Sequence, residues 1–204
     1  MAEEKFDFTI ENLGTCTIAS PIKLSTVHGD YTANYVSDNS YVINNINVFD
    51  TGKPVVLDSS NLMEKAGPRE KIYFDPKHAK AGICTCGGLC PGLNDVIRAI
   101  VRCLNTRYGV KTIKGYQYGF RGFFAESGYE PIELDRYLID EIHKIGGTYL
   151  GTSRGGGQRV EEIVDCLERD GINMLFILGG DGTQRGSYDI ACEVEKRGLK
   201  CAVV

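Results

Sequence analysis

The sequence predicts an α/β fold, a three-layer βαβ sandwich in which helices cover a mainly parallel sheet. Two observations carry this prediction. From residue 80 onward, short apolar segments alternate with amphipathic stretches of about ten to fifteen residues, the pattern of βαβ units. Residues 1–80 hold four of the 25 glycines and residues 81–204 hold the other 21, so tight turns and close backbone approaches are expected there.

The expected strands are short apolar runs that end in glycine or polar residues. They are residues 81–86, 110–115, 148–150, 173–178 and 200–204, with a further short strand within 71–76. Because ligands of parallel sheets bind beyond the carboxyl ends of the strands, the segments after them matter most. Four such segments are rich in glycine or polar residues: 87–94, 115–123, 151–158 and 179–186.

The expected helices have apolar residues at helical spacing. They are residues 94–108, 135–145, 160–170 and 187–197. In the first helix Ile97, Val101 and Leu104 share a face, and in the third Ile163 and Leu167 point inward. Each helix is followed by a glycine, the residue that most easily adopts the left-handed conformation of a helix stop. These glycines are Gly109, Gly146, Gly171 and Gly198.

Composition limits the function. The 204 residues suffice for one large domain or two small ones, and a formal net charge of −4 argues against sequence-independent nucleic-acid binding. No run approaches 18 apolar residues, so no membrane-spanning helix is expected. The acidic first five residues lack the apolar region of a signal peptide, which predicts a cytoplasmic protein. Residues 1–69 are expected to form a partly ordered N-terminal extension, and residues 70–204 the α/β lobe.

Eight cysteines do not predict a disulfide scaffold. Four lie on expected helices or in an expected strand, where cysteine acts as a small buried hydrophobic residue: Cys103, Cys166, Cys192 and Cys201. Three others form a C-x-C-x3-C pattern, Cys84, Cys86 and Cys90. Structural zinc sites usually combine two cysteine pairs, and no second pair follows, so zinc is not expected.

The first glycine-rich segment is Thr85-Cys-Gly-Gly-Leu-Cys-Pro-Gly-Leu-Asn. It joins a strand to a helix N-terminus, where free N–H groups attract anions. Gly87 and Gly88 would let a phosphate approach the backbone. The segment matches neither G-x4-G-K-[ST] nor G-x-G-x-x-G, and a simple tight turn remains an alternative.

The second segment is Gly151-Thr-Ser-Arg-Gly-Gly-Gly-Gln. Its Arg154 offers a planar, permanently charged guanidinium that can bind phosphate oxygens in a bidentate manner. A surface loop with a solvated arginine is the alternative. Nearby, Tyr118 and Phe120 are possible neighbours of a bound base, although packing over the core explains them equally well.

The third segment, Gly179-Gly-Asp-Gly-Thr-Gln-Arg-Gly, directly follows an apolar strand. Asp181 is suited to Mg²⁺, which binds through one or two carboxylates together with substrate phosphates. Gly180 and Gly182 leave space for a nucleotide, and Thr183 can cap the next helix or donate to phosphate. An aspartate in an ordinary turn is the alternative, and Arg185 is expected to be solvated. If the three segments converge, they predict a phosphotransferase.

These motifs resemble those of ATP-dependent 6-phosphofructokinases of the long-chain type found in plants and some protists. The resemblance rests on the three segments above together with Gly115-Tyr-Gln-Tyr-Gly-Phe-Arg-Gly-Phe, in the family's order over about residues 70–204. It implies a nucleotide-binding lobe, with ATP and Mg²⁺ as cofactors. The ATP-binding residues that it implies are Gly88, Arg154, Gly155, Gly180, Asp181, Gly182 and Thr183, and Asp181 is the implied Mg²⁺ ligand. Glycine at 182 implies ATP as the phosphoryl donor, since pyrophosphate-dependent members typically carry a second aspartate there.

The resemblance also implies that something is missing. In the family, a Thr-Ile-Asp-Asn-Asp segment follows the next strand and supplies the proton acceptor, but this chain ends at Val204. We therefore expect an incomplete N-terminal fragment that holds no catalytic base and is inactive alone. The full-length relative is expected to phosphorylate fructose 6-phosphate to fructose 1,6-bisphosphate in glycolysis, as a homo-oligomer. The alternatives are a pyrophosphate-dependent enzyme, a non-catalytic regulatory or pseudo-enzyme subunit, and, with a poorer fit, a NAD or lipid kinase.

Overall fold

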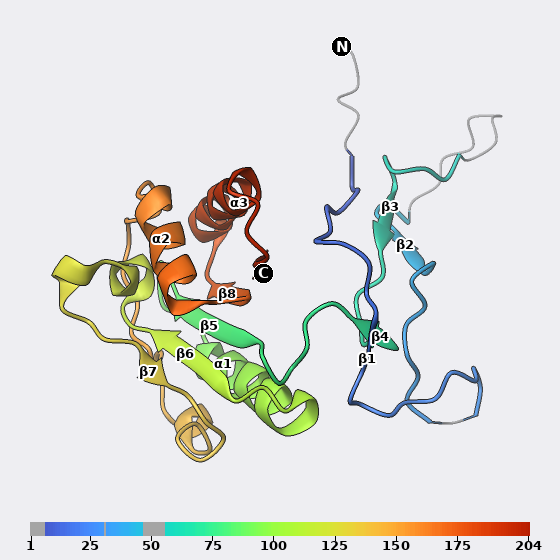
Figure 1. Cartoon of the computed structure of the whole chain (residues 1–204), viewed down its shortest axis with the longest axis horizontal. Helices are drawn as coiled ribbons and strands as arrows, with labels where there is room; N and C mark the ends of the chain where they lie inside the picture. Colours follow the sequence, from blue (N-terminus) through green and yellow to red (C-terminus); the bar gives the residue numbers. More distant parts are fainter. Residues whose placement is uncertain (1–6, 31, 47–55) are drawn as a thin grey trace, which may run out of the picture. The chain divides into compact units, whose positions relative to one another are not determined.

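The computed structural model describes residues 7–30, 32–46 and 56–204 (Figure 1). The acidic first five residues, and parts of the expected extension, lie outside the described residues. The chain divides into two compact units, Met1–Tyr73 and Phe74–Val204. In the described part of the chain, no helix is both long and apolar enough to cross a membrane.

The first unit contains two small antiparallel sheets. β1 (Ile18–Ala19) pairs with β4 (Lys71–Ile72), and β2 (Tyr41–Ile43) pairs with β3 (Leu62–Glu64). Arg69 links these short elements, because its guanidinium donates to the carbonyl oxygens of Val36 at 3.2 Å and Lys65 at 2.7 Å. The same guanidinium pairs with the carboxylate of Glu64 at 3.1 Å.

The second unit is built on a five-stranded sheet in the order β7-β6-β5-β8-β9. Its strands are β5 (Lys80–Thr85), β6 (Thr112–Tyr116), β7 (Ile132–Glu133), β8 (Met174–Leu178) and β9 (Ala202–Val203). All neighbouring pairs are parallel except β6 with β7, which is an antiparallel edge. The predicted, mainly parallel sheet is therefore confirmed.

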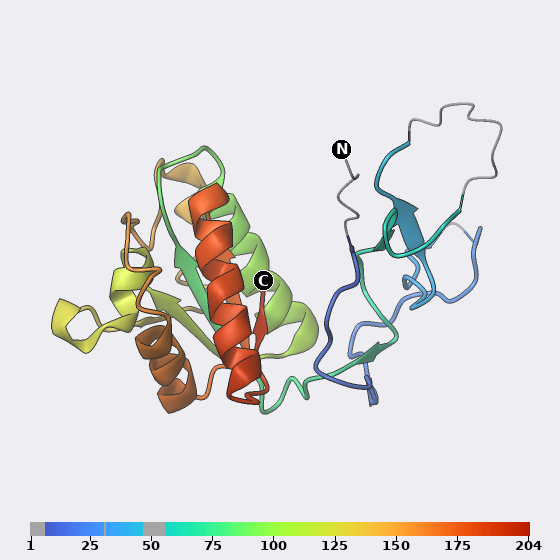
Figure 2. The same cartoon turned by 90° about the horizontal axis from the view of Figure 1, so that it is seen from above.

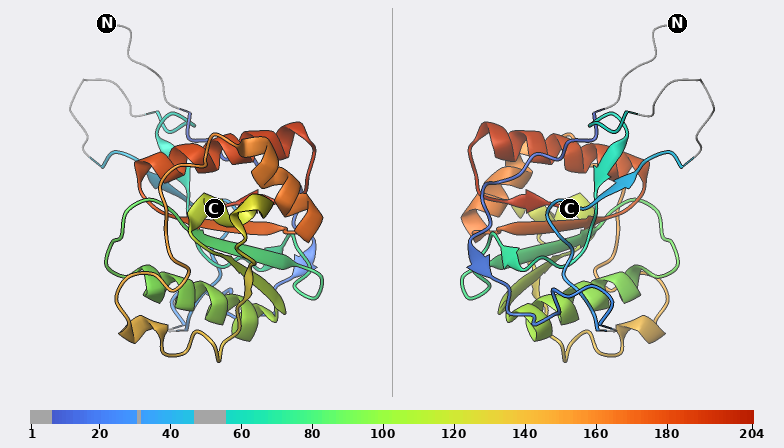
Figure 3. Two further views of the ribbon diagram at one scale, coloured as in Figure 1. Left: turned by 90° about the vertical axis from the view of Figure 1, so that its left-hand side faces the viewer. Right: turned by 90° about the vertical axis from the view of Figure 1, so that its right-hand side faces the viewer.

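Helices cover both faces of this sheet, giving the predicted three layers (Figures 2 and 3). α1 (Leu93–Arg102), which continues as a π-helical stretch over Cys103–Tyr108, covers one face, and α2 (Val160–Asp170) and α3 (Asp181–Lys196) cover the other. Two separate apolar cores follow from this. One joins α1 to the sheet through Ile83, Ile97 and Val101, and the other joins α2 and α3 to it through residues such as Leu167 and Ile190.

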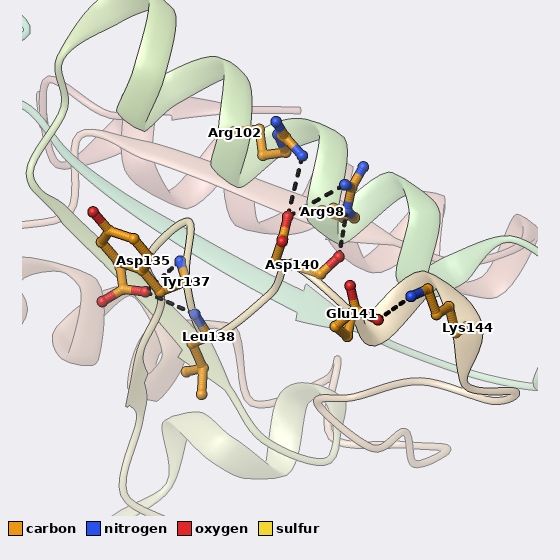
Figure 4. A network of polar contacts seen from close by, with 8 residues as sticks. All are labelled: Arg98, Arg102, Asp135, Tyr137, Leu138, Asp140, Glu141 and Lys144. Carbon is orange, nitrogen blue, oxygen red and sulfur yellow. Dashed lines mark hydrogen bonds and ion pairs between the residues drawn. The ribbon is translucent and has the colours of Figure 1, made fainter.

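The prediction of a helix at residues 135–145 was wrong, because this helix does not form (Figure 4). This stretch forms turns and one short 3₁₀ segment, η4 (Ile142–Lys144). The Asp135 carboxylate accepts the backbone N–H groups of Tyr137 and Leu138, both at 2.8 Å, which closes a local turn in place of a helical one. Arg98 of α1 then donates to the backbone carbonyl of Asp140 at 3.0 Å, so tertiary contacts hold the irregular path.

Two further expectations need correction. Residues 148–150 form a turn rather than a strand, because the Tyr149 N–H donates to the side chain of Asn94 at 2.6 Å instead of to a neighbouring strand. α3 begins at Asp181, six residues before the predicted start, so the Asp-Gly-Thr sequence belongs to its first turn.

The expected glycine stops are confirmed at three positions. Gly109, Gly171 and Gly198 have positive φ angles of 80°, 67° and 65° after their helices. Gly146 does not stop an α-helix, since residues 135–145 form only turns and a short 3₁₀ segment. Of the four cysteines expected to be buried, Cys166 and Cys201 are buried and Cys103 is partly buried. Cys192 is exposed, because it lies on the outer face of α3.

Candidate functional site

The candidate site forms where β5 and β8 end side by side. These parallel neighbours are in register to their last residues, with Thr85 opposite Leu178. The Cys86 N–H continues the pairing by donating to the Leu178 carbonyl at 2.8 Å. The segment that leads from β5 to α1 therefore lies next to the start of α3.

Hydrogen bonds bring the segment 151–158 to the same place, although no strand precedes it. The Thr85 hydroxyl donates to the Gly151 carbonyl at 2.6 Å, and the Gly87 N–H donates to the Ser153 carbonyl at 2.9 Å. In return, the Thr152 hydroxyl donates to the Gly87 carbonyl at 2.8 Å. Three glycine-rich segments distant in sequence thus meet at one edge of the sheet.

The meeting point is a cavity of about 510 Å³. Every residue that the sequence assigned to nucleotide binding lines it: Gly88, Arg154, Gly155, Gly180, Asp181, Gly182 and Thr183. The structure thereby brings these residues together, and their binding roles stay a prediction. Gly87, which was also expected to admit a phosphate, lines the cavity too, and so do residues that the sequence did not assign to it: Cys86, Ser153, Gly157, Gln158, Gly186 and Asp189.

The start of α3 gives one wall of this cavity an affinity for anions. Gly180 precedes the helix, and its carbonyl accepts the N–H groups of Thr183 at 2.9 Å and Gln184 at 3.0 Å. No side chain caps the helix, so N–H groups of its first turn are available to a ligand at the positive end of the helix dipole. Asp181, the first helical residue, is exposed at the same end.

Two glycines of the third segment differ in how much space surrounds them. A Cβ atom at Gly179 would lie 2.6 Å from the Cβ of Thr183 and 2.7 Å from the Cys86 carbonyl oxygen, so only glycine fits where the loops meet. At Gly182 a Cβ would meet nothing within 4 Å. The space beside Gly182 is therefore open.

Charges of both signs face the cavity. Arg154 and Arg185 are exposed cations, and Asp181 and Asp189 are exposed carboxylates. Arg185 is thus solvated, as expected, but it also faces the candidate site. An arginine beside helix N–H groups suits phosphate oxygens, and Asp181 offers an oxygen ligand to a divalent cation; both fit a magnesium nucleotide.

The aromatic residues take different positions. Phe120 lines the cavity but is only 4% exposed, because its ring fits against Gly157 and Gly186. Tyr118 is 40% exposed, and its backbone carbonyl accepts the Ser153 hydroxyl at 2.6 Å. Phe120 therefore forms the floor of the cavity rather than an exposed stacking surface.

The cysteines at the edge of the site are buried thiols. Cys84 and Cys86 lie with their Sγ atoms 3.8 Å apart, and the hydrogen bond between the two thiols together with burial raises the pKa of Cys84 well above its usual value. Cys90, the third cysteine of the pattern, is exposed.

Some missed lining residues had a signal in the sequence. Asp181, Arg185 and Asp189 are spaced by four, so they share one face of a helix that starts at Asp181. The expected start at residue 187 concealed this spacing. The positions of Ser153 and Gln158 had no such signal, because they depend on contacts between segments.

The comparisons with known proteins agree with this geometry. The phosphofructokinase family matches residues 80–204. The chain is 49% identical over 201 residues to "ATP-dependent 6-phosphofructokinase" of Borreliella burgdorferi, covering 98% of this chain and 44% of that protein. It is 48% identical over 142 residues to the protein of the same name from Trypanosoma cruzi, covering 70% of this chain and 29% of that protein. The chain therefore spans less than half of the length of these relatives.

Solved structures share the fold. The T-state phosphofructokinase of Pichia pastoris aligns with a TM-score of 0.54 at 24% identity, covering 67% of this chain and 15% of that chain. A pyrophosphate-dependent phosphofructokinase from Nitrosospira multiformis aligns with a TM-score of 0.53 at 16% identity, covering 60% and 31%. Because the match of the family extends over the whole sheet and all three glycine-rich segments, this chain belongs to the phosphofructokinase family.

Proposed function

We propose that the complete protein transfers the γ-phosphoryl group of ATP to fructose 6-phosphate and forms fructose 1,6-bisphosphate. The observation that carries this proposal is the cavity in which all seven residues assigned to ATP meet. The names of the curated relatives support the choice of reaction.

The residues of this chain have distinct roles in the proposal. Arg154 binds phosphate oxygens, and the N–H groups at the start of α3 hold the phosphate chain next to Gly182. Asp181 holds Mg²⁺, which when bound neutralises phosphate charge. Gly88 and Gly155 allow the backbone to approach the nucleotide. Together these residues position the donor and balance its charge, which is most of what phosphoryl transfer requires.

ATP is favoured over pyrophosphate as the donor. Gly182 leaves open space beside the phosphate-binding end of α3, where a larger acidic residue would place a negative charge. The relatives at 44–49% identity are named ATP-dependent. The similarity to pyrophosphate-dependent enzymes of known structure, at 16–17% identity, reaches only the fold.

From the family resemblance we further propose a homo-oligomer that works in the cytoplasm, without nucleic-acid or membrane partners. The relatives do not all share one compartment, since two from Arabidopsis thaliana are named chloroplastic. Fractionation of cells that carry a tagged copy of the complete gene product, and light scattering on the purified protein, test these two points.

The test of the reaction is an assay of fructose 1,6-bisphosphate formation by the complete gene product. We expect product with ATP and Mg²⁺, much less product with pyrophosphate, and a large loss of activity in Asp181→Asn. Asp140→Asn, at a carboxylate outside the cavity, is the matched control and should stay active. If the folded complete gene product forms no fructose 1,6-bisphosphate with either donor, the proposal is refuted. If its activity is higher with pyrophosphate than with ATP, the choice of ATP is refuted.

A further inference from the structure

Arg159 lies directly after the glycine-rich segment 151–158 and is held on three sides. Its guanidinium lies over the ring of Phe124, 3.8 Å from the ring centre. It pairs with the carboxylate of Glu126 at 2.5 Å and donates to the carboxylate of Glu162 through Nε at 2.7 Å. These partners come from the 3₁₀ segment η3 (Ala125–Ser127), the residue before it, and the first turn of α2, so Arg159 joins three parts of the chain.

Beneath Arg159, the ring of Phe124 determines the path of the glycines. Gly156 has a φ of +88°, which side chains rarely adopt, and a Cβ there would lie 3.1 Å from the Cβ of Phe120 and 3.3 Å from Phe124 Cε2. Gly157 packs on the same Phe120 ring. The two phenylalanines thus form a platform on which Gly156 and Gly157 rest, and the stacked guanidinium covers the outer side of Phe124.

The other end of the segment is fixed separately. The Ser153 carbonyl accepts the Gly87 N–H at 2.9 Å, and the Ser153 hydroxyl donates to the Tyr118 carbonyl at 2.6 Å. Arg154 therefore stands between two anchors, Ser153 on one side and the platform held by Arg159 on the other. Three consecutive glycines carry much backbone freedom, so without the second anchor the direction of Arg154 would be poorly defined.

We propose that Arg159 is a positioning residue for ATP: it holds Phe124 over the glycine run and thereby fixes Arg154 toward the phosphates, without contacting the nucleotide itself. In this proposal the carboxylates of Glu126 and Glu162 hold the Arg159 guanidinium in place over Phe124, and the guanidinium is not needed to bind phosphate. The Arg159 guanidinium is already paired with Glu126 and Glu162. Arg159 is not among the described residues that line the 510 Å³ cavity. The inference rests on the proposed function, because it takes ATP as the ligand.

The test measures the dissociation constant of Mg-ATP for the complete gene product by calorimetry, with the KM for fructose 6-phosphate and the thermal unfolding midpoint measured beside it. We expect Arg159→Met to weaken ATP binding about tenfold or more, since small misplacements of a binding group have effects of this order. In the same variant, the KM for fructose 6-phosphate should change by less than about twofold.

Arg197→Met is the matched control. Like Arg159, Arg197 joins two parts of the chain through two carboxylates and lies outside the lining of the cavity; its Nη1 is 2.6 Å from Asp165 of α2 and its Nε 2.7 Å from Glu193 of α3. The stacking on Phe124, however, belongs to Arg159. Arg197→Met should lower the unfolding midpoint as much as Arg159→Met does, and leave ATP binding unchanged. If both variants weaken ATP binding equally, Arg159 has only a general structural role and the proposal fails.

Glu126→Gln separates positioning from direct contact and does not depend on the folding of Arg159→Met. If Arg159 positions the segment, the loss of one carboxylate partner weakens ATP binding. If Arg159 instead contacts phosphate, the same change frees its charge and leaves ATP binding equal or tighter, which would overturn the proposal. Wild-type protein that binds no ATP at all would remove the proposed function itself, so the two failures are distinguishable.

Discussion

The hydroxyl of Thr85, at the end of β5, donates a hydrogen bond of 2.6 Å to the carbonyl oxygen of Gly151, which lies 66 residues further along the chain. Thr85 is fully buried, and its oxygen also lies 2.9 Å from the hydroxyl of Thr148. A single side chain therefore joins the central strand to the segment that carries Arg154. This contact explains how a segment without its own strand becomes part of the site.

Replacing this threonine by the isosteric valine should leave the Gly151 carbonyl and the Thr148 hydroxyl without their partner. An unsatisfied buried polar group costs about 1–3 kcal/mol, so Thr85→Val should lower the free energy of unfolding by about that amount. Urea denaturation followed by circular dichroism measures it. Thr85→Ser keeps the hydroxyl and should lose much less; equal losses in the two variants would show that the hydrogen bond is unimportant.

The close approach at Gly179 gives a second prediction. In Gly179→Ala the new Cβ meets Thr183 and the Cys86 carbonyl at less than 3 Å, so the two loops must separate at a cost of about 1–3 kcal/mol in the free energy of unfolding. Gly182→Ala, three residues along and in open space, is the control and should be at least as stable as the wild type. The two unfolding midpoints, measured side by side, decide the point, and a stable Gly179→Ala would contradict the packing described here.

A third prediction concerns the choice of donor. Gly182→Asp should fold, because the position is open, but its carboxylate would stand next to Asp181 and repel the phosphates of ATP. We expect ATP binding to weaken about tenfold or more, which corresponds to about 1.4 kcal/mol. Gly182→Asn has nearly the same shape without the charge and should bind ATP more tightly than Gly182→Asp does. Equal binding by both variants would rule out charge as the cause.

How much the sequence could predict differed from element to element. α2 was predicted at both ends, because Ile163 and Leu167 have helical spacing and Gly171 stops the helix in the left-handed conformation. The helix at residues 135–145 failed, although Ile139 and Ile142 are buried. Asn94 donates to the carbonyls of Ile142 and Ile145, at 3.0 and 2.9 Å, and these contacts over about 50 residues are invisible to a local pattern.

The site shows the same division. All seven residues assigned to ATP were found lining one cavity. Two of the three glycine-rich segments follow parallel strands and therefore end at one edge of the sheet, whereas segment 151–158 follows a turn and reaches this edge through hydrogen bonds such as that from Thr85 to Gly151. The predicted start of α3 was too late, because Gly182 and Gly186 have a low intrinsic helix propensity. The structure gives a reason for one of them: Gly186 packs on the Phe120 ring, where a Cβ would lie only 3.3 Å from the ring atoms.

A fourth prediction concerns pH. Asp170 ends α2, where its carboxylate accepts the Tyr116 hydroxyl at 2.9 Å and pairs with Lys114 at 3.1 Å. Burial acts to raise the pKa of the Asp170 carboxyl, but the hydrogen bonds from Tyr116 and Lys114 outweigh it and hold this pKa below its usual value of 3.8. A carboxyl whose pKa is lowered by folding contributes stability above its unfolded pKa and loses it as the pH falls through the folded value.

The wild type should therefore exceed Asp170→Asn in free energy of unfolding by a constant amount at pH 5–7, and the difference should shrink below about pH 4. Urea denaturation of both proteins at pH 7, 5, 4 and 3 measures the difference directly. Asp165→Asn, at an exposed carboxylate of the same helix, is the control. A difference between the wild type and Asp170→Asn that stays unchanged down to pH 3 would show that Asp170 is not ionised in the way described.

The most direct test of the candidate site is a crystal structure of this protein grown with Mg²⁺ and a non-hydrolysable ATP analogue. The account predicts the triphosphate in the 510 Å³ cavity, with phosphate oxygens within hydrogen-bonding distance of the Arg154 guanidinium and of N–H groups at the start of α3. It also predicts Mg²⁺ near Asp181 and the Arg159 guanidinium still stacked on Phe124. A nucleotide bound elsewhere, such as in the neighbouring 540 Å³ cavity lined by Glu161 and Lys196, would contradict the account.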